Sequence, residues 1–165
     1  MITAAFARTM AAYNAEMNRR VYAAADRLGD DARRAERGAF WGSIHGTLDH
    51  LLWADQTWMS RFEGGAKPAV AIKDSRRLLD SFAEMTALRV ALDARIVAWA
   101  GAVSDESLQG DLVWLSGAAQ REMRRPRGLR VTHFFNHQTH HRGQAHALIT
   151  AAGEDTGETD LFLIT

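Results

Sequence analysis

Apolar residues recur at intervals of three and four along most of the chain, the spacing that gathers them on one face of an α-helix. The first such stretch covers residues 2–28 and carries the apolar series Ile2, Phe6, Met10, Tyr13, Met17, Val21, Ala24 and Leu28. The run Gly29-Asp30-Asp31 then ends the pattern. We therefore expect a first amphipathic helix over residues 2–28.

The same spacing predicts a second and a third helix. Ser43 precedes the second apolar series, and its short polar side chain suits the N-cap of a helix over residues 43–62. Asp74 or Ser75 is the expected cap of the third helix, which should run over residues 74–103. A loop containing two glycines and a proline separates these two helices.

The last third of the chain combines an irregular segment with a fourth helix. Residues 104–127 contain two glycines, the short apolar run L-V-W-L and Pro126, which favour an extended excursion such as one hairpin over the end of the bundle. Residues 127–152 are again helical in pattern, and Gly153 is a natural stop. The whole pattern predicts an all-α fold, a four-helix bundle with a short irregular or hairpin excursion before the last helix.

Several polar residues interrupt the apolar faces. Asn14 and Asn18 lie on the first helix, where we expect interhelical or solvent hydrogen bonds rather than contacts into a site. Arg89 is embedded in the third apolar stripe, and we expect it to extend its charge to solvent rather than to pair with a buried anion. The apolar end of the tail, L-F-L-I-T, is expected to fold back onto the bundle or onto a second subunit.

Composition narrows the class of protein. The 165 residues suit a single domain over 1–165, and 20 Lys and Arg balance 20 Asp and Glu, so no overall charge attracts nucleic acid or an anionic membrane. Cysteine is absent, so a metal would be held by nitrogen and oxygen atoms alone. No apolar window approaches a membrane-spanning length and no leader pattern is found, which makes the cytoplasm the expected location.

The fourth predicted helix carries a polar stripe where an apolar one would be expected. The run H-F-F-N-H-Q-T-H-H-R-G-Q, residues 133–144, holds four of the seven histidines. At about 100° per residue, one arc gathers His133, His137, His140, His141 and Gln144. His137 and His141 are four residues apart, so their imidazoles lie one turn above the other and can bind one ion.

Two histidines are too few for a metal site, and the second helix offers two candidates for a third. His50 lies beside the small residues Thr47, Ala54 and Thr57, whereas His45 lies on the opposite flank next to Asp49. The helical pattern leaves both open. Three neutral imidazoles would suit a divalent transition metal such as Zn, Ni, Mn or Fe and would leave a coordination position for water or substrate.

The second-helix run S-I-H-G-T-L-D-H-L-L and the later run N-H-Q-T-H-H-R-G-Q resemble the two signature segments of the DinB (damage-inducible) family, within the wider DinB/YfiT-like superfamily. The resemblance spans nearly the whole chain. It implies a four-helix bundle, commonly dimeric, that binds a divalent metal through three histidines. Position by position it assigns these ligands to His50, His137 and His141.

The resemblance also implies a function. Relatives include thiol-dependent transferases, so we expect a metal-dependent enzyme that uses a low-molecular-weight thiol against an electrophile, or a hydrolase with Asp49, Asp55 or His133 as its base. His133, His140 and Gln144 are the candidate catalytic or ligand-orienting residues. Arg142 points away from the histidines and is expected to form a salt bridge or a dimer contact.

Two alternatives remain from a different class of function. The ion could serve only to tie the second helix to the fourth in a non-catalytic, metal-stabilised stress-response protein. The chain could also be a dimeric binding module for small apolar molecules, because Trp41, Trp53, Trp58 and Trp114 fall near the expected pocket. A fourth protein ligand would favour the first alternative, since structural sites are closed.

Overall fold

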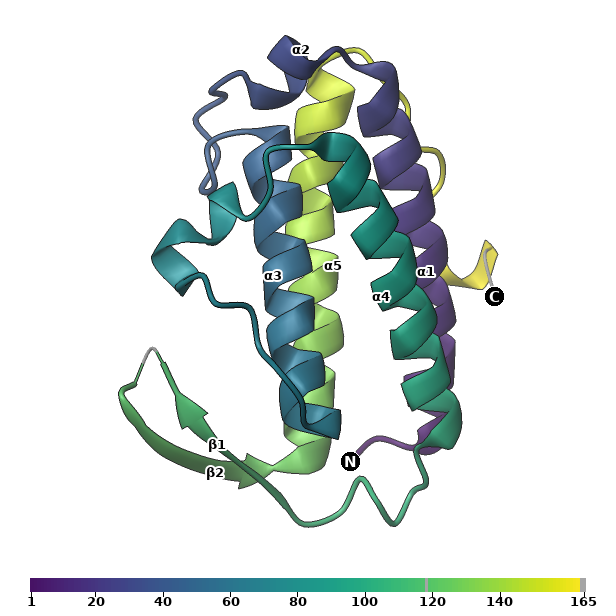
Figure 1. Cartoon of the computed structure of the whole chain (residues 1–165). Helices are drawn as coiled ribbons and strands as arrows, with labels where there is room; N and C mark the ends of the chain where they lie inside the picture. The colour runs from purple at the N-terminus through teal and green to yellow at the C-terminus, as the bar shows by residue number, and fades with distance from the viewer. Residues whose placement is uncertain (118, 164–165) are drawn as a thin grey trace.

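Four long helices form the body of the protein, and a small hairpin precedes the last of them (Figure 1). The computed structural model describes residues 1–117 and 119–163. Its elements are α1 (Ala4–Arg27), α2 (Asp30–Arg34), α3 (Ile44–Glu63), η1 (Ile72–Arg77), α4 (Phe82–Ala102), β1 (Asp111–Ser116), β2 (Arg121–Pro126), α5 (Arg127–Ala151) and η2 (Leu161–Leu163). The mostly helical architecture and the hairpin confirm the predicted fold.

The helix ends follow local side-chain chemistry. Ser43 caps α3, its side chain accepting a hydrogen bond from the backbone N–H of Gly46 at 3.0 Å, as expected. Gly153, with φ of 95°, ends α5 where the sequence placed the stop. Thr3 caps α1 through the N–H of Phe6. The short helix α2, which the apolar pattern does not predict, begins directly after Gly29.

The start of the third long helix was predicted wrongly. Residues 72–77 form a separate turn of 3-10 helix, η1, and α4 begins at Phe82 with Ser81 as its cap, accepting from the N–H of Glu84 at 3.2 Å. Ser75 is fully buried, and its hydroxyl is used in contacts with η1 and α3. Ser75, which was expected to cap a helix, therefore connects η1 to α3 instead.

The hairpin extends from the end of the bundle formed by α3 and α5 (Figure 1). Strands β1 and β2 pair antiparallel, with Trp114 opposite Met123. The Trp114 ring lies 5.9 Å from that of Trp58 on α3, so the hairpin is anchored to the bundle by aromatic packing. Because β2 leads directly into α5, the hairpin also fixes where α5 begins.

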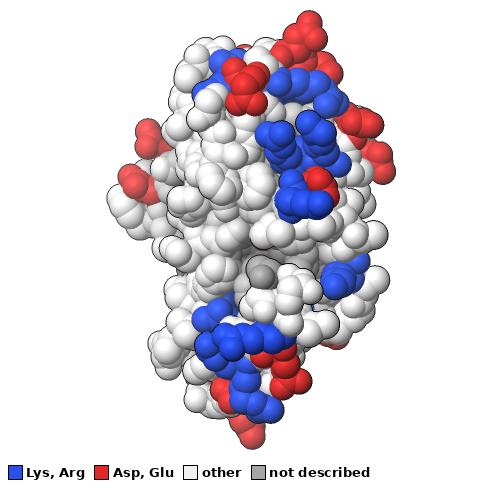
Figure 2. All heavy atoms as spheres, turned by 90° about the vertical axis from the view of Figure 1, so that its left-hand side faces the viewer, with Lys and Arg blue, Asp and Glu red and all other residues white. Residues whose placement is uncertain are grey.

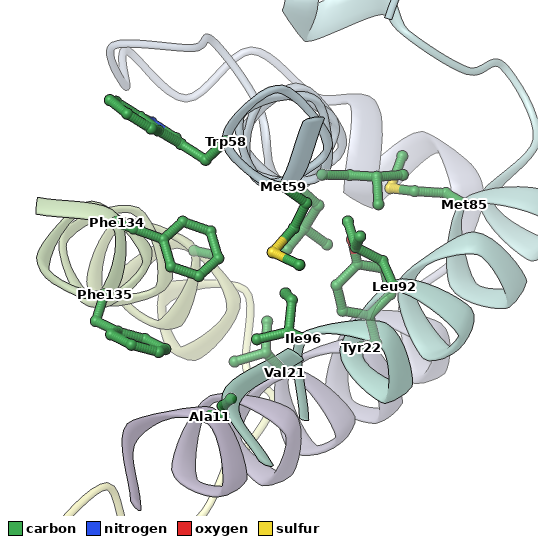
Figure 3. Packing of buried hydrophobic residues seen from close by; sticks show 14 of the residues in the cluster. Ala11, Val21, Tyr22, Trp58, Met59, Met85, Leu92, Ile96, Phe134 and Phe135 are labelled. Carbon is green, nitrogen blue, oxygen red and sulfur yellow. The ribbon is translucent and has the colours of Figure 1, made fainter. Parts of the chain in front are cut away.

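The core lies between the four long helices. Helix α1 packs against α4 and α5, and α3 packs against α5 and α4. Figure 3 shows side chains from all four meeting in the interior, among them Val21, Met59, Ile96 and Phe134. Within the described residues, no helix has both the length and the apolar character needed to cross a membrane.

The surface charge is mixed. Figure 2 shows basic and acidic side chains together toward both ends of one face, with a broad band between them that is mostly free of charge. This agrees with the equal numbers of acidic and basic residues in the sequence.

A buried ionic network crosses the bundle interior. Arg89 on α4 is 1% exposed and donates to Asp55 on α3 at 2.7 Å, and it pairs with Asp93 at 2.8 Å. Asn14 and Asn18 on α1 donate to Asp93, which confirms their expected interhelical hydrogen bonds. The interpretation of Arg89 as a solvent-reaching side chain was wrong, because two buried carboxylates surround its charge. Burial raises the pKa of Asp55 to about 6 against the opposing effect of Arg89.

Arg142 also differs from its prediction. It lies on the face of α5 away from the histidines, as expected, but it is 5% exposed and donates to the side-chain oxygen of Asn14 on α1. It forms no ion pair with any described residue. The expected salt bridge is therefore replaced by a hydrogen bond from the charged guanidinium to a neutral amide inside the protein.

The polar half of the C-terminal tail folds back onto α1. The Tyr13 hydroxyl donates to the carbonyl of Thr159 at 2.6 Å, and Arg20 donates to the carbonyl of Glu158 at 3.0 Å. The apolar end does not become buried, since Phe162 is 77% exposed. The last residues of the predicted apolar patch, 164–165, lie outside the described part of the chain.

We expect Arg89→Met to lower the free energy of unfolding by about 3–5 kcal/mol, because it leaves two buried carboxylates without their counter-charge. Arg95 on the same helix offers a matched control, since it pairs with Glu63 at 2.8 Å but is 44% exposed. Arg95→Met should cost no more than about 1 kcal/mol. Urea unfolding followed by circular dichroism measures both. Equal losses in the two variants would contradict a stabilising role for the buried network.

Candidate metal centre

Three histidines meet where α3 packs against α5. His50 comes from α3, and His137 and His141 come from successive turns of α5. One ring nitrogen from each lies within 4.8 Å of the other two. The ring centroids are 4.7 Å apart for His50 and His141, and 4.3 Å apart for His137 and His141. This buried group could hold a metal ion.

The structure resolves the choice between the two histidines of α3. His45 points to the other side of the helix, where its Nε2 donates to the carbonyl of Leu79 at 2.8 Å and lies 3.7 Å from Asp49. His50 faces α5 instead and is 2% exposed. The resemblance therefore selected the histidine that the fold brings to the pair on α5.

A serine from η1 orients His50. The Ser75 hydroxyl donates to the carbonyl of Ile72 at 2.7 Å, so its oxygen accepts the hydrogen bond from Nδ1 of His50 at 2.8 Å. With the proton on Nδ1, Nε2 of His50 keeps its lone pair for a ligand. Such hydrogen bonds to the second ring nitrogen are usual around metal-binding histidines.

Gln144 does the same for His141. Its side-chain oxygen accepts from Nδ1 of His141 at 2.8 Å, which leaves Nε2 of that ring free of its proton. The amide nitrogen of Gln144 lies 3.3 Å from Nε2 of His140 and donates to it. Gln144 is thus a positioning residue that connects two histidines of the stripe.

His137 supplies the test of whether an ion fits. Its Nδ1 is buried and has no hydrogen-bond partner among the described residues. A buried polar atom without a partner is costly, and native structures rarely contain one unexplained. Because two neighbouring imidazoles already have ring nitrogens prepared as ligands, and a ring nitrogen of His137 lies within 4.8 Å of one on each of them, the residues present fit a divalent transition metal.

Burial keeps the three rings uncharged. Together with the neighbouring imidazoles, which contribute less, it lowers the pKa of His50 and that of His137 to about 3 each. Burial also lowers the pKa of His141, although the hydrogen bond to Gln144 opposes the change. All three rings are therefore neutral at pH 7, which is the form that binds metals.

A pocket of about 320 Å³ opens in front of the three histidines. Besides the triad it is lined by Phe40, Trp41, Ile72, His140 and Gln144. The Trp41 indole stacks on His50, with ring centroids 3.8 Å apart and planes at 19°. Phe40 forms the outer rim and is 78% exposed. The pocket thus has a polar floor, an apolar wall and an opening to solvent.

The other candidate residues fall into two groups. His140 and Gln144 line the pocket, whereas His133 lies one turn earlier on α5 with its ring 5.2 Å from that of Trp58. Asp49 accepts from the backbone N–H groups of Leu78 and Leu79, and Asp55 is held by Arg89. The pocket lining therefore includes no carboxylate.

Sequence reasoning missed two residues of the site. Ser75 was considered only as a helix cap, and no sequence signal connects it with a histidine 25 residues earlier. Trp41 was noted among four tryptophans near the pocket, but its stacking on His50 was not foreseen. Its position just before the cap of α3 was the available signal, since a residue there packs beside the first turns of that helix.

We expect Ser75→Ala to weaken the binding of added Zn²⁺ by about 10–100-fold, because His50 loses the hydrogen bond that fixes its ring. Ser60→Ala is the matched control, since that hydroxyl on α3 donates only to the backbone carbonyl of Thr57. Competition with a chromogenic chelator measures both affinities. Unchanged affinity in Ser75→Ala would show that the hydrogen bond does not prepare a ligand.

Comparison with known proteins agrees with this arrangement. The chain matches the model of the DinB family over residues 1–164. It is similar to the crystal structure of a DinB-like protein from Bacillus cereus ATCC 10987, with a TM-score of 0.62 and 19% identity over 86% of this chain and 89% of that chain. No curated protein matched the sequence. The match over nearly the whole length, together with the shared helical fold, shows that the chain belongs to the DinB family.

Proposed function

We propose that this protein is a metal-dependent enzyme that binds a divalent transition metal, Zn, Ni, Mn or Fe, through His50, His137 and His141. One observation carries the proposal: three neutral imidazoles, two of them buried and one half-buried, bring their ring nitrogens within 4.8 Å of one another at the floor of a pocket. In two of them, His50 and His141, the Nδ1 atom donates a hydrogen bond, to Ser75 and to Gln144 respectively, which leaves Nε2 for a metal. A set of histidines placed only for packing would not need this preparation.

Three candidate ligands without a fourth would leave a bound ion with a free position, which supports a catalytic rather than a purely structural role. Structural zinc sites are closed by four protein ligands, whereas catalytic sites keep a position for water or substrate. Across residues 1–117 and 119–163, the His, Cys, Asp or Glu group that could hold an ion contains these three histidines and no fourth member. The pocket lies directly against them.

Thiol transfer fits the pocket better than hydrolysis. A divalent ion would supply Lewis acidity, which lowers the pKa of a thiol or of water. Asp49 and Asp55, two of the bases considered for hydrolysis, are engaged elsewhere, and His133 does not line the pocket. The chain has no cysteine, so the thiol would be a separate small molecule whose sulfur bonds to an electrophilic carbon while that carbon's leaving group departs with its electron pair and takes up the proton.

His140 is the proposed proton acceptor for that thiol. Gln144 donates to Nε2 of His140, so the lone pair of this nitrogen is held in that hydrogen bond at the edge of the pocket, and it would accept a proton when the amide of Gln144 turns away. The proton on the sulfur of an incoming thiol would pass to an imidazole nitrogen of this type, leaving the thiolate as the nucleophile. The apolar wall formed by Phe40, Trp41 and Ile72 would hold the carbon part of the electrophile.

A non-catalytic role for the metal is the second candidate. The triad joins α3 to α5, so an ion there would also stabilise the bundle by linking two helices. In that case the removal of metal would lower the melting temperature, and no small molecule would bind in the pocket. The size of the pocket and its opening to solvent favour the catalytic role.

Metal content tests the site itself. The protein purified without a histidine tag should contain close to one divalent ion per chain by elemental analysis, and His137→Ala should lose it because two imidazoles hold an ion weakly. His133→Ala, one turn earlier on the same helix and exposed, is the matched control and should keep the metal. Absence of metal from wild type, even after incubation with Zn²⁺, Ni²⁺, Mn²⁺ and Fe²⁺, would refute the proposed centre.

Turnover tests the role of His140. With a low-molecular-weight thiol and a chromogenic electrophile, His140→Gln should lower kcat by about a hundredfold while the metal content stays at the wild-type level. His133→Gln makes the same chemical change outside the pocket and should retain activity. Equal rates in the two variants would show that His140 is not the proton acceptor. Metal-loaded wild type without thiol-transfer activity would favour the non-catalytic role.

A further inference from the structure

A second cavity lies on the other face of α5, between that helix, α1 and the returning tail. Its volume is about 170 Å³, which corresponds to roughly five or six water molecules at about 30 Å³ each. The lining residues of α5 are Thr139, Arg142, Gly143 and His146. These follow the three- and four-residue spacing of one helix face, and none of them belongs to the pocket of the histidine triad.

Arg142 gives the cavity a buried positive charge. Burial lowers its pKa to about 10, so the guanidinium remains protonated at neutral pH. Its side chain makes one hydrogen bond among the described residues, to Asn14, although a guanidinium carries five N–H donors. The neighbouring carboxylates Asp55 and Asp93 are instead bound by Arg89. Arg142 is therefore a buried cation with donors to spare and no anion in contact.

The two charged side chains that line the cavity, Arg142 and Arg20, are both basic. Arg20 on α1 contributes a second guanidinium, which is held by Glu16 and by the carbonyl of Glu158. His146 contributes an imidazole whose Nδ1 is hydrogen-bonded to the hydroxyl of Thr156. No aspartate or glutamate is among the lining residues, and Glu16 approaches only the outer guanidinium. The electrostatic environment thus favours an anion.

The remaining walls are apolar or neutral. Met17, Val21 and the ring of Tyr13 line the side formed by α1. Thr156 and Thr159 of the tail close the opposite side, and the Tyr13 hydroxyl fixes this part of the tail through the carbonyl of Thr159. Gly143 leaves space, because a Cβ placed there would meet nothing within 4 Å. Carbon atoms of a ligand would therefore contact apolar side chains while its charge faces Arg142.

From this combination we infer that the cavity between α1, α5 and the tail binds a small organic monocarboxylate, with Arg142 and Arg20 as the groups that recognise its charge. The planar guanidinium matches the two oxygens of a carboxylate. The apolar wall distinguishes an organic acid from an inorganic anion. The site is separate from the metal centre and does not depend on the function proposed for it.

The wild-type protein tests the ligand class. Full-length chain labelled with ¹⁵N would be titrated at constant ionic strength with butyrate, butyramide or inorganic phosphate. Butyrate should cause saturable shifts of the amides of Thr139, Gly143, Thr156 and Thr159, and butyramide and phosphate should not. No saturable response to butyrate, or an equal response to butyramide or phosphate, would overturn the inference.

Variants test the residues. Arg20→Gln should weaken butyrate binding by about tenfold or more, the effect of one lost charge-assisted hydrogen bond. Arg19→Gln is the matched control, because Arg19 pairs with the same Glu16 but does not line the cavity, and its affinity should stay within about twofold of wild type. Equal affinities in these two variants would contradict the role of Arg20.

Gly143→Leu tests the cavity without removing a charge. Leucine is a better helix former than glycine, and its side chain would fill the space. Butyrate binding should be abolished while the melting temperature is maintained.

Arg142→Met should also abolish binding, with its fold checked by circular dichroism. If Arg142→Met does not fold, Gly143→Leu and Arg20→Gln still decide, since wild-type affinity in a folded Gly143→Leu would overturn the inference.

Discussion

The packing of α3 against α5 is the contact on which the rest of the structure depends. It places His50 opposite His137 and His141, at a seam where apolar side chains would ordinarily lie. The polar rings can be buried there because they are neutral and because Ser75 and Gln144 satisfy two of their outer nitrogens. The hairpin, η1 and the loop that carries Trp41 all lie next to this helix pair. The segments outside the long helices are therefore concentrated near the three histidines.

Helix α5 is unusual because polar side chains on two of its faces line two separate pockets. One face carries the triad, and the other carries Arg142 and His146 toward α1 and the tail. Between them, Phe134, Phe135 and Ile149 supply the apolar contacts that hold the helix in the core. A helix with so narrow an apolar stripe depends on specific polar contacts for its orientation. The neighbouring network of Arg89, Asp55 and Asp93 adds further contacts of that kind between α3 and α4.

The sequence predicted those features that depend on neighbouring residues. The helices, the N-cap at Ser43, the stop at Gly153 and the hairpin follow from local spacing and capping chemistry, and the structure confirms them. The errors involve contacts between distant segments. Arg89 meets a carboxylate 34 residues away, and Ser75 gives its hydroxyl to a histidine rather than to a helix end. The family resemblance, rather than the helical pattern, selected His50 over His45. The spacing of residues along α3 does not show which flank of that helix faces α5.

The stacking of Trp41 on His50 gives the protein an internal optical signal. The indole lies 3.8 Å from the imidazole, centroid to centroid, and its plane is nearly parallel to that ring. Indole emission is sensitive to charge and polarizability in direct contact with it, so any change at His50 alters the spectrum of this tryptophan first. Trp53, whose ring centroid lies 6.0 Å from that of His50, gives a second and more distant response, and the other three tryptophans supply the background. Binding of an ion at the triad would therefore be visible in solution in real time, without a label and without altering the site.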